Sequence, residues 1–297
     1  MGYLLSHATG NQQVDAILLA AIDLLEKTLP GRSSAYYLHG SFVEQTGIAT
    51  SDIDLFLIAK SPFTPEEHKI VQRVTQQPAF LAPFPLEIIV LDEARVLQEG
   101  HYRLTAASAL LWGRDIRDAL PEQTLDQYLR MYAHFPLVYL AHMLRNVEHA
   151  PLTLTYPRPD EEFYGYDQQQ LPPGNEPRHN IKKLVTSVCW TATVLTAWYA
   201  GKMVTGKYAS TRMYREYVGD EWSSFIEDMY RLGNRRWHYL VPEDQDERRK
   251  LRQLCAQTLA FEQHYLNHYK DYLLHELQCA GERGRLAEQR LAQIDIS

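Results

Sequence analysis

The segment Asp52–Ile58, with the sequence DIDLFLI, is the feature that most constrains the fold. Its large apolar and β-branched residues form a nearly continuous run, which is typical of a strand covered on both faces. The run nevertheless contains Asp52 and Asp54, and carboxylates are seldom buried unless something compensates their charge. The segment therefore predicts a buried strand whose two aspartates need a partner.

The residues around this strand predict a compact α/β unit. The expected elements are a helix over residues 12–28, strands over Ala35–Leu38 and Asp52–Ile58, a helix that begins after Thr64, and a strand over Leu86–Leu91. Thr64 is the expected N-cap of the second helix, and Glu67 closes a capping box. Helix, strand, strand, helix and strand within about 80 residues are typical of an α/β domain.

From Thr124 onward amphipathic helical patterns replace the strand signals, over residues 124–150, 208–232 and 246–277. Leu184–Ala200 has no charge but is shorter than the roughly 20 residues that span a bilayer. It therefore predicts a buried helix, and we expect no membrane segment. The predicted fold class is α+β: an N-terminal α/β domain with a small mixed sheet (residues 1–120), followed by an all-helical C-terminal domain (residues 121–297).

Composition narrows the partners and the location. The formal net charge of −7 argues against a protein that coats DNA or RNA, although a locally basic site is compatible with it. The three cysteines are far apart and lack CxxC spacing, which indicates reduced thiols and no zinc site. Among the 12 histidines we identify no HxxxH pair on a convincing helical face, so no second metal site is predicted. The N-terminus lacks the pattern of a signal peptide, and we expect a cytoplasmic protein.

Acidic residues and one turn together predict phosphoryl chemistry. Asp52 and Asp54 leave the same face of a strand, where they repel each other unless a cation lies between them. Mg²⁺ is the usual cation of an all-oxygen site that also holds phosphate. Gly40 and Ser41 follow a strand end, where glycine permits close backbone approach and a serine hydroxyl suits a phosphate. Glu87, the acid within LEIIVL, completes a site for metal-assisted phosphoryl transfer.

These residues carry a family resemblance. Gly40-Ser41, a spacer and Asp52-Ile53-Asp54-Leu55 resemble the GS and DxD signature of the polymerase-β-type nucleotidyltransferase superfamily. The chain is most similar to the aminoglycoside nucleotidyltransferases of the streptomycin/spectinomycin type, which have a glutamate as third acid and a helical C-terminal domain. The resemblance implies that residues 1–120 form the nucleotidyltransferase domain and that residues 109–121 leave it. It also implies that Asp52 and Asp54 hold magnesium and that Glu87 is the base for the acceptor hydroxyl or a further metal ligand.

Two further sites follow from the resemblance and from the charge pattern. The family has a Thr-Gly-x-x-x-x-Lys run whose lysine reaches phosphate; here Thr211 stands at the lysine's place, and Lys207 or Arg212 is the candidate substitute. The proline-rich residues 157–176 are rich in acids and aromatic residues, which attract cationic sugars. Glu161, Glu162 or Asp167 is the expected contact with a cationic acceptor, and the alternative for this segment is a disordered, solvated linker.

The sequence thus predicts an enzyme that transfers a nucleoside monophosphate, AMP from ATP being the first choice among nucleoside triphosphates. The expected cofactor is Mg²⁺, and the expected acceptor is a hydroxyl of a small, aminoglycoside-like molecule. The alternatives are a toxin–antitoxin-type nucleotidyltransferase that modifies a protein or RNA, and a non-catalytic nucleotide-binding module.

Overall fold

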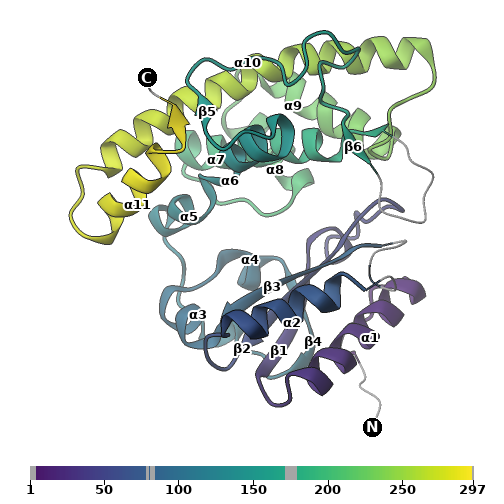
Figure 1. The fold of residues 1–297 in the computed structure, drawn as a ribbon, viewed down its shortest axis with the longest axis vertical. Helices are drawn as coiled ribbons and strands as arrows, with labels where there is room; N and C mark the ends of the chain where they lie inside the picture. Colours follow the sequence, from purple (N-terminus) through teal and green to yellow (C-terminus); the bar gives the residue numbers. More distant parts are fainter. Residues whose placement is uncertain (1–4, 78–79, 81–83, 171–178, 296–297) are drawn as a thin grey trace. The chain divides into compact units, whose positions relative to one another are not determined.

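The computed structural model describes residues 5–77, 80, 84–170 and 179–295. It divides into two compact units between Thr124 and Leu125. The N-terminal unit contains α1 (Gln12–Thr28), β1 (Ser33–His39), η1 (Gly40–Phe42), β2 (Ile53–Ala59), α2 (Pro65–Thr75), β3 (Leu86–Asp92), α3 (Glu93–Glu99), α4 (Tyr102–Ala106), β4 (Ser108–Gly113) and η3 (Arg117–Ala119) (Figure 1). The boundary between residues 120 and 121 stays a prediction.

The four strands form one small mixed sheet in the order β3-β2-β1-β4. β1 is antiparallel to β2 and to β4, whereas β2 is parallel to β3. The predicted α+β class is therefore confirmed. β4 is an addition to the predicted fold: the sequence leads us to expect that residues 109–121 leave the domain, whereas Ser108–Gly113 form a strand of its sheet. β4 lies at the edge of the sheet and only Leu111 within it is buried, so it lacks the apolar run that marks β2.

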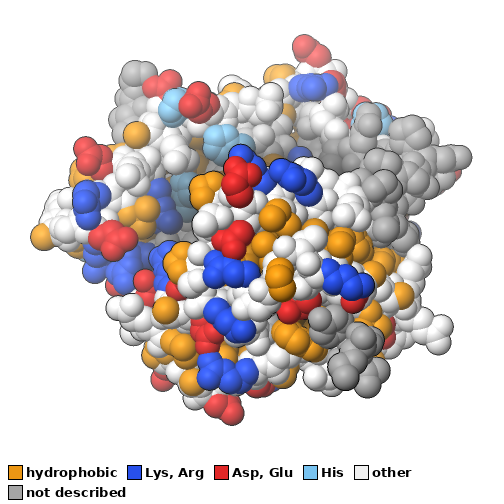
Figure 2. Space-filling model, turned by 60° about the horizontal axis from the view of Figure 1, so that its bottom comes forward, with side chains coloured by type: hydrophobic (Ala, Val, Ile, Leu, Met, Phe, Trp, Pro, Cys, Tyr) orange, Lys and Arg blue, Asp and Glu red, His pale blue; other side chains and the backbone are white. Residues whose placement is uncertain are grey.

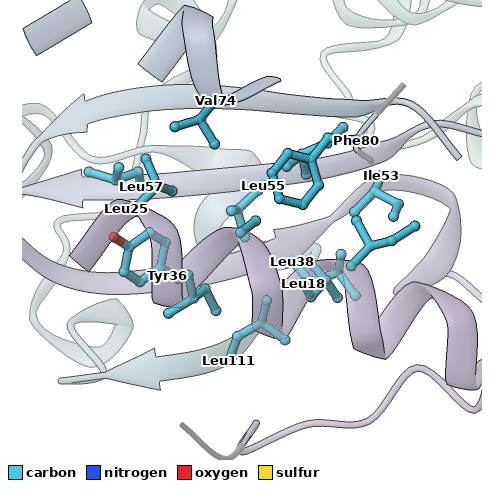
Figure 3. Close-up of a cluster of buried hydrophobic side chains, with 14 of the residues drawn as sticks. Leu18, Leu25, Tyr36, Leu38, Ile53, Leu55, Leu57, Val74, Phe80 and Leu111 are labelled. Carbon is cyan, nitrogen blue, oxygen red and sulfur yellow. The ribbon is translucent and has the colours of Figure 1, made fainter. Parts of the chain in front are cut away.

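Helices α1 and α2 cover one face of the sheet, and their boundaries follow local signals. α1 coincides with the predicted residues 12–28, and the side chain of Asn11 caps it by accepting backbone N–H groups. α2 has the predicted capping box: Thr64 Oγ1 accepts the N–H of Glu67, and Glu67 Oε2 accepts the N–H of Thr64 (2.7 Å). Figure 3 shows the core beneath them, with Leu18 of α1 and Val74 of α2 packed against strand residues such as Leu55.

The opposite face of the sheet is covered by α3, α4 and η3. Its core contains Tyr37, Phe56, Val96, Leu104 and Ile116, among others. Because side chains alternate along a strand, Leu55 and Phe56 lie on opposite faces of β2, and both are buried. The strand is thus covered on both sides, as DIDLFLI predicts.

The C-terminal unit is helical, apart from two pairs of two-residue strands. Its elements are α5 (Leu125–Tyr132), α6 (Phe135–Val138), η4 (Tyr139–Arg145), β5 (Ala150–Pro151), β6 (Gln169–Gln170), β7 (His179–Asn180), α7 (Lys182–Ala200), α8 (Lys207–Tyr217), α9 (Ser223–Tyr230), η5 (Arg231–Arg236), α10 (Gln245–Glu276), α11 (Glu282–Leu291) and β8 (Ile294–Asp295). β5 pairs with β8, and β6 pairs with β7. Within the described ranges, no helix is long and apolar enough to cross a membrane. α7 instead packs against α8, α9 and α10 with most of its residues buried.

Two of the predicted helical stretches are broken into shorter helices. Residues 124–150 form α5, α6 and the π-helical η4, with Pro136 in the first turn of α6. Residues 208–232 fall into α8 and α9 and reach into η5, and Gly219 adopts a left-handed conformation (φ +65°) between the first two. The apolar pattern continues across both breaks, so periodicity alone did not reveal them.

Candidate active site

The register of the sheet brings the three predicted acids together. β2 and β3 run parallel, and Asp54 lies directly opposite Glu87. Asp52 immediately precedes β2, so both strands present acids where they begin. Since Ile53 and Leu55 enter the core under α1 and α2, Asp52 and Asp54 belong to the other face of the sheet.

The geometry of this acidic cluster fits a hard divalent cation. One carboxylate oxygen from each of Asp52, Asp54 and Glu87 lies within 4.8 Å of the others. The two aspartates are half-buried, whereas Glu87 is exposed. Two oxygens that share an Mg²⁺ ion at about 2.0–2.1 Å are separated by at most about 4.2 Å. A small adjustment of the side chains would therefore bring all three carboxylates into one coordination shell.

The turn after β1 is built around the carboxylate of Asp54. Gly40 has φ +76°, and a Cβ atom on it would lie 2.2 Å from Asp54 Oδ2. Only glycine allows the backbone to pass so close to that carboxylate. The next residue, Ser41, has a buried hydroxyl without a hydrogen-bond partner within the described chain. Such an orphaned group is explained when a ligand oxygen completes its hydrogen bonding.

A histidine cluster beside the acids was not predicted from the sequence. His39 lies opposite Asp54 in the β1–β2 pair, and its ring stacks on Phe56 at 3.8 Å. Arg103 Nη2 lies 3.1 Å from His39 Nδ1; because a guanidinium only donates, the neutral ring carries its proton on Nε2. Burial, assisted by the positive charges of Arg103 and His101, lowers the pKa of His39 well below its ordinary value. His39 is therefore neutral and adds no positive charge near a cation site. The one feature of the sequence that could have identified His39 is its position directly before Gly40.

The predicted nucleotide contacts Lys207 and Arg212 belong to the C-terminal unit. Lys207 is the first residue of α8, and its ammonium group lies 5.4 Å from the centre of the Tyr239 ring. Arg212 is exposed on the same helix. Thr211, which stands at the place of the family's lysine, is buried, and its hydroxyl donates to the carbonyl oxygen of Tyr208. The nucleotide-binding roles of Lys207 and Arg212 stay predictions.

The three predicted acceptor-binding acids also lie in the C-terminal unit, and each has a basic neighbour. Glu162 pairs with Arg248 of α10, which holds the pKa of the Glu162 carboxyl below its ordinary value. Glu161 pairs with Arg158 at 2.9 Å. Asp167 Oδ2 lies 3.6 Å from His179 Nδ1. The role of these acids in acceptor binding is untested and stays a prediction.

The segment that carries these acids is packed against the rest of the C-terminal unit over its described part, residues 157–170. The Phe163 and Tyr166 side chains are each only 2% exposed. Arg252 of α10 donates to the backbone carbonyl of Glu162 and lies over the ring of Tyr164. The alternative of a disordered linker is therefore wrong for these residues. Residues 171–176 of the predicted loop lie outside the described residues.

One sequence inference on histidines is also wrong. His264 and His268 stand four residues apart on α10, and their ring centres are 4.7 Å apart. The chain therefore does contain an HxxxH pair on a helical face. The two histidines alternate with aromatic residues of α10 that are typical of a helix packed against a core, so the sequence pattern alone did not distinguish them.

Comparison with known proteins agrees with this architecture at the level of the fold. No protein-family profile matches the chain, and no curated protein matches its sequence. A similar solved structure is the spectinomycin adenyltransferase AAD(9) from Enterococcus faecialis, crystallised with ATP and spectinomycin. It is 13% identical, has a TM-score of 0.50, and matches over 85% of this chain and 98% of its own. At this identity the likeness concerns the fold: the chain has an α+β fold like that of a nucleotidyltransferase.

Proposed function

We propose that the protein is a magnesium-dependent nucleotidyltransferase that moves AMP from ATP onto a hydroxyl of a small, cationic, aminoglycoside-like acceptor. The observation that carries the proposal is the cluster of Asp52, Asp54 and Glu87, whose ligand atoms lie within 4.8 Å of one another, beside the Gly40–Ser41 turn. The similar fold of an adenyltransferase crystallised with ATP and spectinomycin supports it. A cytoplasmic location, where ATP is abundant, belongs to the proposal.

The residues of the cluster take distinct roles in this reaction. Asp52 and Asp54 hold the cation, which when bound neutralises charge on the triphosphate. The Ser41 hydroxyl donates to a phosphate oxygen, and Gly40 lets the turn approach it closely. Glu87, the most exposed acid, accepts the proton of the attacking hydroxyl or completes the metal site. The hydroxyl oxygen then bonds to the α-phosphorus, and pyrophosphate leaves.

The direct test is pyrophosphate release from each of the four nucleoside triphosphates, with Mg²⁺ and a panel of acceptors. Asp52→Asn should lower turnover by at least about 10²-fold, because the cation loses a charged ligand. Its melting temperature should be unchanged or slightly raised, since repulsion within the cluster is relieved. Asp118→Asn, at an exposed acid of the same unit, is the matched control. Turnover of Asp52→Asn within a few-fold of the unaltered protein would exclude the site.

A second variant separates the two roles of Glu87. If Glu87 is a general base, the Glu87→Gln variant should still bind ATP with Mg²⁺, but its rate of transfer should fall by roughly 10²–10⁴-fold. If Glu87 is a metal ligand, the variant should instead lose the magnesium-dependent part of its affinity for ATP. Isothermal titration with ATP in the presence and absence of Mg²⁺ distinguishes these outcomes.

The acceptor site is tested through the acidic segment. A cationic acceptor that binds Glu162 must displace Arg248 from it. Neutralising Glu161, Glu162 and Asp167 together should therefore raise the KM of the acceptor and weaken its dependence on salt. An unchanged KM would exclude these acids as the acceptor site.

The alternative acceptors are decided by the same assay. Figure 2 shows Lys and Arg side chains beside Asp and Glu side chains on one face of the molecule. Ion pairs such as Arg32–Glu67 and Lys69–Glu66 are further examples of this mixture. This mixture and the net charge of −7 weigh against RNA as the acceptor. If no aminoglycoside supports pyrophosphate release, modification of a protein or RNA becomes the first hypothesis, and no release with any acceptor favours a non-catalytic module.

A further inference from the structure

The C-terminal unit contains a cluster of side chains of the types that bind transition metals. His264 and His268 of α10 both direct Nε2 at the phenol oxygen of Tyr199 on α7. The oxygen lies 3.2 Å from His264 Nε2 and 2.7 Å from His268 Nε2. Two nitrogen atoms of α10 thus lie close to one oxygen atom of α7, although the two histidines follow Tyr199 by 65 and 69 residues in the chain.

The spacing of these atoms is close to that of ligands around one metal ion. In a tetrahedral zinc site with bonds of about 2.0–2.1 Å, neighbouring ligand atoms are separated by about 3.3 Å. Two histidines at i and i+4 on a helix are a known way to present two imidazole ligands on one face. These two separations are compatible with one cation shared by the Tyr199 oxygen and the imidazole nitrogens, provided that the phenol gives up its proton when the cation binds.

The surroundings of the cluster favour a cation and leave it accessible. The negative charges of Asp220 and Glu221 act on both Tyr199 and His264, which favours a cation beside them. Burial, together with these charges, raises the pKa of Tyr199 to about 12, so the phenol is protonated without an ion and releases its proton only when the cation binds. Tyr199 is 44% exposed and the two histidines are half-buried, so an ion and a completing water ligand can enter from solvent. The acidic residues do not themselves join the ligand set: among the described residues, the one group of three or more acidic, histidine or cysteine ligands is the Asp52 cluster.

We propose that His264, His268 and Tyr199 form a binding site for a divalent transition-metal ion of the Zn²⁺ class, which links α7 to α10. Two imidazoles and one phenolate suit Zn²⁺, Cu²⁺ or Ni²⁺, whereas Mg²⁺ prefers oxygen ligands. An open fourth position occupied by water makes the ion exchangeable rather than permanently enclosed. The inference does not rest on the proposed nucleotidyl transfer, because none of its three ligands is a residue assigned to that reaction.

The test uses the full-length protein, stripped of metal with a chelator, and Zn²⁺ or Co²⁺ alone as the probe. We expect saturable Zn²⁺ binding that raises the melting temperature, because an ion bound to the native state stabilises it. Bound Co²⁺ should give a visible d–d absorption band. His264→Gln and His268→Gln should each raise the Kd by at least about tenfold, since loss of even an outer partner of a metal ligand costs 10–100-fold. Tyr199→Phe keeps the ring and removes only the oxygen, and it should change the Co²⁺ spectrum.

Two controls make the result specific. His275→Gln alters an exposed histidine on the same helix and should leave the Kd unchanged. Asp52→Asn combined with Asp54→Asn removes the acidic cluster and should also leave the Zn²⁺ response of α10 intact. An unchanged Kd in His264→Gln/His268→Gln would overturn the site. So would a Zn²⁺ response that disappears when Asp52 and Asp54 are replaced.

Discussion

The arrangement of the acidic cluster is locally destabilising. Carboxylates of Asp52, Asp54 and Glu87 within 4.8 Å of one another repel, and two of them are half-buried. Gly40 adopts a backbone conformation that other residues adopt only with strain, and its backbone lies directly against the carboxylate of Asp54. The proposed cation would offset the repulsion among the acids, and a phosphate oxygen would accept a hydrogen bond from the Ser41 hydroxyl.

Replacing Gly40 by alanine should separate backbone strain from damage to the site. The positive φ should cost about 1–2 kcal/mol, and the new Cβ must also push Asp54 away. Gly31→Ala is the matched control, because Gly31 has φ +70° but nothing within 4 Å of an added Cβ. We expect similar losses of stability from the strain itself, but a fall in transfer of about 10²-fold only in Gly40→Ala. Equal activity of the two variants would contradict this view of the turn.

Protonation of buried His101 should destabilise the N-terminal unit in acid. Burial, with a smaller effect from the charge of Arg103, lowers the pKa of His101 from 6.5 to about 4. Between these values the unfolded chain binds a proton that the folded chain does not, so stability falls as pH decreases from 6.5 to about 4. In His101→Asn the side chain can still cap α4, as His101 Nδ1 does by accepting the Leu104 N–H at 3.1 Å.

The measurement is the free energy of unfolding in urea at several pH values across this window. His101→Asn should flatten the dependence by up to about 1.4 kcal/mol per pH unit, the effect of one proton. His275→Asn, at an exposed position, should leave the slope as it is. A slope unaltered by His101→Asn would show that this ring is not the group that titrates.

At the scale of elements, one buried guanidinium joins three parts of the C-terminal unit. Arg145 ends η4, pairs with Glu262 of α10 at 2.6 Å, and donates to the carbonyl of Thr155, two residues before the proline-rich segment. Tyr166 of that segment donates to the same carboxylate at 2.8 Å. Burying such a pair has a large desolvation cost, so the network specifies where the segment docks more than it adds stability.

Removing one charge of the Arg145–Glu262 pair should lower the free energy of unfolding far more than removing both charges. Arg145→Met leaves Glu262 buried without its counter-charge and should cost about 3–5 kcal/mol in urea unfolding. Arg145→Met combined with Glu262→Met should recover a good part of that loss. Protease cleavage within residues 151–170 should increase in the single variant. Additive losses in the double variant would mean that the two residues do not act as a pair.

At the scale of the whole molecule, each unit contains its own core. The sheet of the N-terminal unit has α1 and α2 on one face and α3, α4 and η3 on the other. The C-terminal unit has a separate core formed largely by residues of α10, η4 and neighbouring helices. Residues 121–123 pack with the N-terminal unit: Gln123 is buried, and its Oε1 accepts the N–H of Tyr102 at 3.1 Å.

This packing makes the position of the domain boundary testable. A fragment that ends at residue 124 should be more stable than one that ends at residue 120, because the shorter one loses the Gln123 hydrogen bond, worth about 1 kcal/mol. Gln123→Ala in the longer fragment should reproduce much of that loss. Identical urea midpoints for the two fragments would favour the boundary after residue 120.

Local signals in the sequence determined β1, β2 and β3, the ends of α1 and α2, and the candidate acids. Each depends on residues a few positions apart: the apolar run of β2, the Thr64–Glu67 capping box, the Asp52–Asp54 spacing. Only the tertiary structure decided how distant parts meet. It added β4 as a half-buried edge strand and placed His39 against Arg103. It also paired Glu162 of the proline-rich segment with Arg248 of α10 and brought Tyr199 to the α10 histidines. The physical reason is that contacts across tens of residues depend on the packing of whole elements, which leaves no periodic trace in the sequence near either partner.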